Sequence, residues 1–248
     1  VAGGAAYAQT KSVNSTAAVT DSTASVTGGS FGAQTLLYGG KAETETDARS
    51  EAKALRNHLT FTTGNTVEEI YGGYAYADPT KTSFSLQANE NHLTAKAGAD
   101  QFFGGYASGE QQAGGTHVPL STAEANANIV TIAAGSGTFK NDSAAGYSDI
   151  GAKKAAAVTT AANANQLTIA GGTFKEAVYG GSTSAANDDA TGTATATARS
   201  NELWANGGTF QKRIGAGEGS ATTKAGAATT TASENKGIAD KMKSVRLA

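Results

Sequence analysis

One repeated pattern constrains this chain more than any other feature. An Asn opens a short strand and a Gly-Gly pair follows a second strand, and both markers recur roughly every 35 residues. The Asn positions are Asn57, Asn91, Asn128, Asn165 and Asn201. The pairs, two of them degenerate, are Gly3-Gly4, Gly39-Gly40, Gly72-Gly73, Gly104-Gly105, Ala145-Gly146, Gly180-Gly181 and Ala216-Gly217. Two independent markers with one period indicate a chain of stacked copies of a single unit.

Each copy predicts three strands. In the clearest copy, from Asn165 to Gly181, Leu167 and Ile169 alternate with polar residues, and Phe174 and Val178 follow a Gly-Gly turn. The remainder of the period alternates Ala with Thr, most regularly at residues 191–198. Alternation with a period of two places the small Ala side chains inside and Thr, a good strand former, outside.

Composition agrees with a repeat protein. Leu, Ile, Val and Phe make up only 35 of the 248 residues, too few for an ordinary compact core, yet the formal net charge is only −2. A chain of this kind folds when its few large apolar residues recur in phase and are buried between neighbouring copies. Cysteine is absent, which excludes disulfides, thiolate metal sites and a cysteine nucleophile.

These observations predict an all-β fold: a parallel β-solenoid with one three-stranded coil per repeat, in which residues 1–248 form a single segment of about seven coils. Leu59, Leu93, Val130 and Leu167 should stack in one inward column. The repeated Asn residues should form a corner ladder whose amides bond between coils. The sequence also suggests short helical turns at residues 49–55 and around Ile238, Met242 and Val245. We expect a segment of a longer solenoid, since the chain opens and closes within a repeat.

The repeats resemble those of a known class of proteins. The motif Asn-x-Leu-Thr, followed by Gly-Gly-Thr-Phe and then by Val-Tyr-Gly-Gly, is similar to the repeats of bacterial autotransporter passenger domains and related surface adhesins. The resemblance covers nearly the whole chain, from Gly3 to about Asn235. It implies a right-handed parallel β-helix displayed at the outer membrane or secreted, and an extracellular or cell-surface location. These motifs describe a fold and carry little functional specificity.

Three groups of residues are candidates for metal ligands. His58 and His92 occupy equivalent repeat positions, and His117 lies alone in a probable loop. A histidine pair without a third ligand makes a poor metal site, so we interpret these residues as strand and loop surface. The polar groups Asn187-Asp188-Asp189 and Asn141-Asp142 offer oxygen ligands for Ca²⁺, although a plain polar loop is the commoner explanation. The prediction is therefore no metal site and no cofactor.

Catalysis by this fold needs carboxylates gathered on one face. Glu43, Glu45 and Asp47 alternate along one strand, and Glu68-Glu69 follow one period later, which indicates an acidic patch. No repeated column of carboxylates with an Arg partner emerges, and no phosphate loop or nucleophile elbow is present. We therefore predict no catalytic residues and no enzyme activity, with a glycan lyase or hydrolase as an alternative.

Two other binding functions are disfavoured. The only basic cluster, residues 236–246, is local and the net charge is slightly negative, which argues against nucleic acid. Outward threonines such as Thr193, Thr195 and Thr197 resemble the arrays of ice-binding solenoids. These threonines do not keep phase between repeats in the sequence, which argues against an ice-binding face.

The predicted function is a non-enzymatic surface scaffold or adhesin. Its partners would be a host-cell or matrix surface, or copies of itself in an extracellular homopolymeric fibre, which is a second alternative. The three aperiodic insertions are free to vary for recognition and should leave the coil at one corner. They comprise residues 77–84, 109–120 and 185–192. The sequence contains no run of 18 apolar residues, so it predicts no membrane span in this segment.

Overall fold

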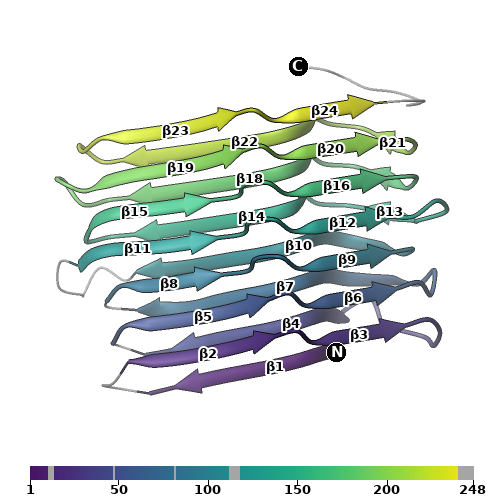
Figure 1. Ribbon diagram of the computed structural model, residues 1–248, viewed down its shortest axis with the longest axis horizontal. Helices are drawn as coiled ribbons and strands as arrows, with labels where there is room; N and C mark the ends of the chain where they lie inside the picture. Colours follow the sequence, from purple (N-terminus) through teal and green to yellow (C-terminus); the bar gives the residue numbers. More distant parts are fainter. Residues whose placement is uncertain (11–13, 47, 81, 112–117, 240–248) are drawn as a thin grey trace.

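The protein is a parallel β-solenoid with three sheets, as the repeat pattern predicts (Figure 1). The computed structural model describes residues 1–10, 14–46, 48–80, 82–111 and 118–239. Every strand pair found in this part of the chain is parallel, and none of its residues is helical. Each coil contributes one strand position to each sheet, so the coils stack from β1 to β24.

Sheet 1 carries the second strand of each repeat and its Gly-Gly pair. Its strands are β1 (Ala2–Gln9), β4 (Leu36–Glu45), β7 (Thr66–Thr80), β10 (Gly98–Gln111), β13 (Thr138–Phe139), β14 (Ser143–Ala152), β17 (Thr173–Phe174), β18 (Val178–Asn187), β21 (Thr209–Phe210) and β22 (Ile214–Thr223). In its later coils a two-residue strand and a ten-residue strand replace the single long strand of β7 and β10.

Sheets 2 and 3 each contain seven strands. Sheet 2 consists of β2 (Ser15–Thr20), β5 (Ser50–Leu55), β8 (Phe84–Gln87), β11 (Val118–Glu124), β15 (Ala155–Ala161), β19 (Thr193–Arg199) and β23 (Ala228–Ser233). Sheet 3 consists of β3 (Thr23–Val26), β6 (His58–Phe61), β9 (His92–Ala95), β12 (Ile129–Ile132), β16 (Gln166–Ile169), β20 (Glu202–Ala205) and β24 (Lys236–Ala239).

The helical turn suggested for residues 49–55 is wrong, because β5 pairs in parallel with β2 and β8 there. Strand pairing with both neighbouring coils overrides the local preference of this Ala-containing segment for a helix. The second suggested turn falls partly outside the described residues. Ile238 lies in β24, whereas Met242 and Val245 are not described.

The core consists of columns of equivalent residues. Leu59, Leu93, Val130 and Leu167 are adjacent in the register of sheet 3 and at most 2% exposed, which confirms the predicted column. A second cluster between sheets 1 and 2 consists mainly of alanine, and the inward residues of β19 are all Ala. Large side chains fill one end of the coil and small ones the narrow end, so few large apolar residues suffice.

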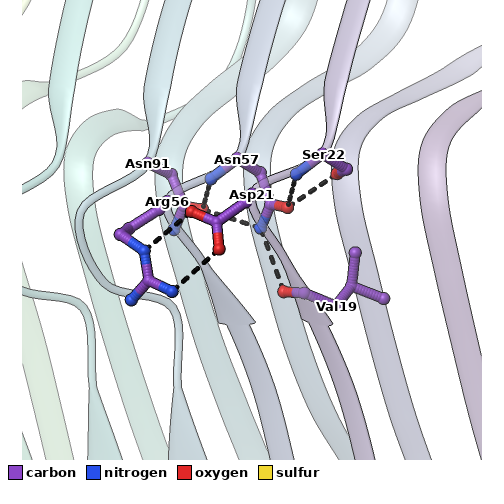
Figure 2. Close-up of polar contacts among 6 residues, drawn as sticks. All are labelled: Val19, Asp21, Ser22, Arg56, Asn57 and Asn91. Carbon is purple, nitrogen blue, oxygen red and sulfur yellow. Dashed lines mark hydrogen bonds and ion pairs between the residues drawn. The ribbon is translucent and has the colours of Figure 1, made fainter.

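The predicted Asn ladder lies at the corner between sheets 2 and 3. Each of the five repeated Asn residues is fully buried. The side-chain amide of Asn57 donates to Oδ1 of Asn91 at 3.0 Å, and that same oxygen accepts the backbone N–H of Asn57 at 3.0 Å. The ladder extends to Asn235 in the last coil. In the first coil Ser22 replaces Asn and bonds to Asn57 (Figure 2). These bonds satisfy buried polar groups that would otherwise be costly.

The positions of the Gly-Gly pairs require glycine because neighbouring atoms occupy the space that a Cβ would need. A Cβ on Gly73 would overlap the side-chain amide of Asn91, and a Cβ on Gly72 would overlap the carbonyl oxygen of Gly104 in the next coil. Neither glycine has a positive φ. The second glycine of each pair therefore makes room for the Asn ladder, which links the two sequence markers physically.

A row of residues with left-handed backbone lies beside the Asn ladder. The residue immediately before each ladder position has φ between 53° and 59°. These residues are Asp21, Arg56, Glu90, Ala127, Ala164, Ser200 and Glu234. None is Gly, although this conformation is strained for other residues. The bidentate ion pair of Asp21 with Arg56 joins two of these positions across neighbouring coils (Figure 2).

Candidate ligand-binding face

Aromatic side chains form two columns on the outer face of sheet 1. In the first column, register pairs Tyr38 with Tyr71, Tyr71 with Phe103, Phe103 with Ala144, and Ala144 with Tyr179. The rings of Tyr38 and Tyr71 stack with centroids 5.2 Å apart, and those of Tyr71 and Phe103 lie 5.6 Å apart. One ring per coil therefore continues until Ala144 interrupts the column.

The second column lies on the C-terminal side of the Gly-Gly pairs, whereas the first column lies on their N-terminal side. It contains Tyr74, Tyr106 and Tyr147, whose neighbouring rings stack 5.2 Å apart. Tyr71 meets Tyr74 edge to face at 5.0 Å, which ties the two columns together. The aromatic ladder, defined as these seven rings, forms a cluster separate from the two core clusters. Pairs of this kind stabilise by about 0.5–1.5 kcal/mol beyond the area that they bury.

A notch opens where Ala144 replaces a ring. Its volume is about 220 Å³, and its lining includes Phe103, Tyr147 and Tyr179. The carboxylates of Asp142 and Glu218 and the hydroxyl of Ser182 also line it. Phe103 and Tyr179 lie two coils apart, about 10 Å at the usual strand spacing. The notch therefore has the size of one missing ring with polar groups at its rim.

Negative charge surrounds the ladder. Burial, reinforced by Glu69, Glu43 and Glu68, raises the pKa of Tyr38 to about 12. Burial together with Asp149 also raises the pKa of Tyr147. The pKa of Asp149 is itself raised by burial. These tyrosines stay neutral at physiological pH, and the face combines aromatic rings with carboxylates.

Two basic side chains cover the ends of the ladder. Nζ of Lys41 lies 5.2 Å from the ring centroid of Tyr38 and 2.9 Å from Oε1 of Glu43. At the other end, the guanidinium of Arg213 lies over Tyr179, with Cζ 5.4 Å from the ring centroid, and forms an ion pair with Glu218. Each cation combines a ring face with a carboxylate, an arrangement that stabilises both contacts.

The predicted acidic patch is partly assembled. Glu43 and Glu69 lie near the first ring of the ladder, where Glu69 accepts a hydrogen bond from the hydroxyl of Tyr71 at 2.6 Å. Glu45 lies at the edge of β4 and accepts hydrogen bonds from Gln9 and Tyr7. Asp47 lies outside the described residues. These carboxylates hold aromatic and amide groups of the surface in place.

Two of the three histidines lie side by side on sheet 3. His58 and His92 stack with ring centroids 4.5 Å apart, as their equivalent positions predict. Burial and the neighbouring His58 lower the pKa of His92. Across the described residues, no group of three or more His, Cys, Asp or Glu side chains could hold a metal ion. His117 is not among those residues.

The two polar groups considered as Ca²⁺ ligands lie at opposite ends of the strands of sheet 1. Asp142 precedes β14 and accepts the backbone N–H of Ala177 at 2.8 Å. Asp188 follows β18 at the other end of the strands and bonds to Lys153 at 2.6 Å. In the register, Ser143 pairs with Val178 and Ala152 with Asn187, so the strand length separates the two groups.

Some of the threonines keep phase and others do not. Thr193 and Thr197 pair with Ala157 and Ala161, as the sequence argument expects, whereas Thr195 pairs with Thr159. On the outer face of sheet 2, register aligns Thr122, Thr159, Thr195 and Thr229. A second column on sheet 3 contains Thr60, Thr94, Thr131 and Thr168. Variable loop lengths hid this alignment in the sequence. The outward column next to the one on sheet 2 includes Lys53, Gln87 and Glu124, so the face is not a uniform Thr array.

Each insertion falls in the chain between a strand of sheet 1 and the next strand of sheet 2, so all three belong to one corner, as predicted. Only the third, residues 185–192, is described throughout. Its Asn187 amide donates to the carbonyl oxygens of Ala155 and Thr193, and Asp189 accepts the backbone N–H of Thr191. These bonds fix the loop to β15 and β19 as well as to itself. Residue 81 and residues 112–117 lie outside the described residues. Of the basic cluster, Lys236 covers Trp204 with Nζ 5.0 Å from a ring centroid, and residues 240–246 are not described.

The sequence reasoning missed the aromatic ladder as a site. Its signal is an aromatic residue on each side of the Gly-Gly pair, as in Tyr71-Gly-Gly-Tyr74 and Phe103-Gly-Gly-Tyr106. The ladder becomes visible only when these segments are aligned by coil.

Comparison with known proteins does not assign this chain to a family. The chain matches no known protein family, and searches of curated proteins and of solved structures found no match. Among the described residues, no helix is long and apolar enough to cross a membrane. The parallel solenoid is established by the structure, and the resemblance to autotransporter passengers is a hypothesis about function.

Proposed function

We propose that the protein is a non-enzymatic scaffold or adhesin, displayed on or secreted from a bacterial cell, that binds through the outer face of sheet 1. The observation that carries this proposal is the aromatic ladder with its carboxylates. The inward columns, the Asn ladder and the glycines are sufficient to explain how the coil forms. The seven rings on the outer face of sheet 1 are not needed for that purpose. Aromatic rings with polar groups at the rim are typical of recognition surfaces.

The similarity of the repeats to autotransporter passengers supports the extracellular location. The carboxylates near the ladder support binding better than acid–base catalysis, because Glu69 and Glu43 already pair with Tyr71 and Lys41. Recognition by the corner insertions and assembly into a homopolymeric fibre stay predictions. The ladder is favoured over the insertions because polar groups of the described insertion already bond to the loop itself and to the preceding coil.

Adhesion of beads coated with the chain tests this proposal, on immobilised matrix proteins and on cells. We expect adhesion to fall when Tyr74→Ser and Tyr106→Ser are combined, and to persist when Thr159→Ser and Thr195→Ser are combined on sheet 2. Circular dichroism must show that both variants fold. If adhesion is instead lost when residues 185–192 are shortened, the insertion is the binding element. Release of reducing ends from polyuronates or other glycans that disappears with Glu43→Gln or Glu69→Gln would establish an enzyme.

A further inference from the structure

The notch at Ala144 is the break within the first column of the ladder, because Ala144 stands in register between Phe103 and Tyr179. Each ladder ring elsewhere in the first column has its next neighbour at 5.2–5.6 Å. At Ala144 the two flanking rings belong to the coils on either side, about 10 Å apart at the usual strand spacing. This distance holds one tilted planar group at the centroid spacing of 5.2–5.6 Å that the ladder has elsewhere.

The charge of the notch favours a cation. Its lining contains the carboxylates of Asp142 and Glu218 and no basic side chain. Glu218 is already paired with Arg213, whereas Asp142 is exposed and is bonded to the backbone N–H of Ala177. Asp149, which lies further along the same strand as Ala144, adds a further carboxylate to the same face. Asp142 therefore presents an exposed negative charge to whatever enters the notch.

The protein itself shows which group packs on such a ring. Arg213 places its guanidinium over Tyr179 while its nitrogen bonds to Glu218. This contact occupies the coil that follows Tyr179, and the notch lies in the coil that precedes it. A guanidinium is flat, stacks on aromatic faces and pairs with carboxylates in a fixed geometry, whereas an ammonium is compact and more strongly hydrated.

We propose that the notch binds the guanidinium of an arginine side chain of a partner protein. The guanidinium lies between Phe103 and Tyr179 and pairs with Asp142. This inference rests on the proposed function, because it names the partner chemistry of the same face. A neutral sugar ring is the main competitor, since Ser182 and its neighbours offer hydroxyl groups to it.

Titration with N-acetyl-arginine amide tests the inference on the whole chain. The readout is the NMR shift of the Phe103 and Tyr179 rings. We expect saturable, millimolar binding that weakens with added salt, and at least tenfold weaker binding of the neutral isostere N-acetyl-citrulline amide. Equal binding of the citrulline compound would overturn the proposal. So would binding of methyl glucoside with no response to the arginine compound.

Two variants separate the notch from the rest of the face. Ala144→Phe adds the missing ring and should abolish arginine binding without lowering the unfolding midpoint. Asp142→Asn keeps an oxygen that can accept the Ala177 N–H and should weaken arginine binding about tenfold, as expected when an ion pair becomes a neutral contact. Asp188→Asn, at the far end of the strands, is the matched control and should change nothing. Unchanged binding in Asp142→Asn would contradict the inference even if Ala144→Phe failed to fold.

The adhesion assay distinguishes the inference from the proposed function. If the wild-type chain adheres and Ala144→Phe adheres equally well, the notch is not the contact and the proposed function still stands. If the wild-type chain does not adhere to any surface while arginine binds the notch, the adhesin proposal fails and the notch site stands. If Ala144→Phe loses adhesion and arginine binding together, the result supports both the proposed function and the notch as its contact.

Discussion

Two aromatic stacks of similar spacing run along this solenoid, one inside and one outside. The inner stack joins Phe139, Phe174 and Phe210 with centroids 5.0 and 4.9 Å apart, and all three rings are at most 3% exposed. The outer stack is the aromatic ladder, whose second column is only partly buried and whose first column lacks a ring at Ala144. The same stacking contact thus serves the core in one place and a surface in the other.

The difference shows which positions the fold constrains. Replacing an inner ring leaves a cavity between coils that cannot close without moving both neighbours. On the outside, a missing ring leaves a notch open to solvent, and the fold persists, as it does at Ala144. Outer positions can therefore vary in a way that inner positions cannot, which is the variation that recognition requires.

The largest expected effect is loss of an inner ring. Phe174→Ala should lower the free energy of unfolding by about 3–5 kcal/mol, the usual cost of truncating a buried aromatic. Its outer counterpart Tyr106→Ala should cost about 1–2 kcal/mol, because Tyr106 is partly exposed and solvent can fill the space that its ring leaves. Thr195→Ser on sheet 2 should be nearly silent. Chemical denaturation measures all three, and equal costs for Phe174→Ala and Tyr106→Ala would remove the distinction between the stacks.

The Asn ladder extends the comparison to polar groups. Asn128→Ala removes Oδ1, which accepts the backbone N–H and the side-chain amide of Asn91 at 2.9 and 3.1 Å. The cost should be about 2–3 kcal/mol, because a fully buried N–H is left without a partner.

Asn126→Ala is the matched control for this ladder. Asn126 lies nearby at a partly exposed position, and its Oδ1 accepts one backbone N–H, that of Asn163 at 2.8 Å. Water can replace this bond, so the cost should be about 1 kcal/mol. If Asn126→Ala destabilises as much as Asn128→Ala in denaturant, burial does not decide the strength of these ladders.

The sequence predicts the coil well because inner positions repeat. Gly73 and Asn91 depend on each other, because the side-chain amide of Asn91 occupies the space that a Cβ on residue 73 would need. The aromatic ladder was missed because its members change identity between coils, from Tyr71 to Phe103 to Ala144. The notch depends on register across the longest repeat, where an insertion of undescribed structure separates the strands. No local pattern marks Ala144 as the neighbour of Phe103.

Alkaline pH should act on the outer stack and spare the inner one. Burial raises the pKa of Tyr38 and of Tyr179 to about 12, and raises that of Tyr74 as well. An unfolded tyrosine loses its proton near pH 10, so above pH 10 the unfolded chain binds fewer protons than the folded one. The stability contributed by these groups is present below pH 10 and falls as the pH rises from 10 through about 12.

The unfolding midpoint at pH 8 and pH 11 measures this effect, with tyrosinate absorbance followed in parallel. Tyr74→Phe keeps the ring but removes the titrating hydroxyl, so it should reduce the loss of stability between these two pH values. Thr195→Ser, which leaves every tyrosine in place, should lose as much as the wild type. A midpoint that is unchanged at pH 11 would mean that the ladder tyrosines ionise without leaving the folded state.

The smallest expected effect concerns backbone strain beside the Asn ladder. Ala164 is exposed and has a φ of 54°, a conformation that costs a residue with a Cβ about 1–2 kcal/mol. Ala164→Gly removes this strain but adds freedom to the unfolded chain, so the net gain should be about 0.5–1 kcal/mol. Gly172, with a φ of 105°, provides the opposite case, and Gly172→Ala should destabilise by at least as much. If Ala164→Gly lowers the unfolding midpoint, stacking with the equivalent residues of neighbouring coils outweighs the strain, and the row of left-handed residues stabilises the corner.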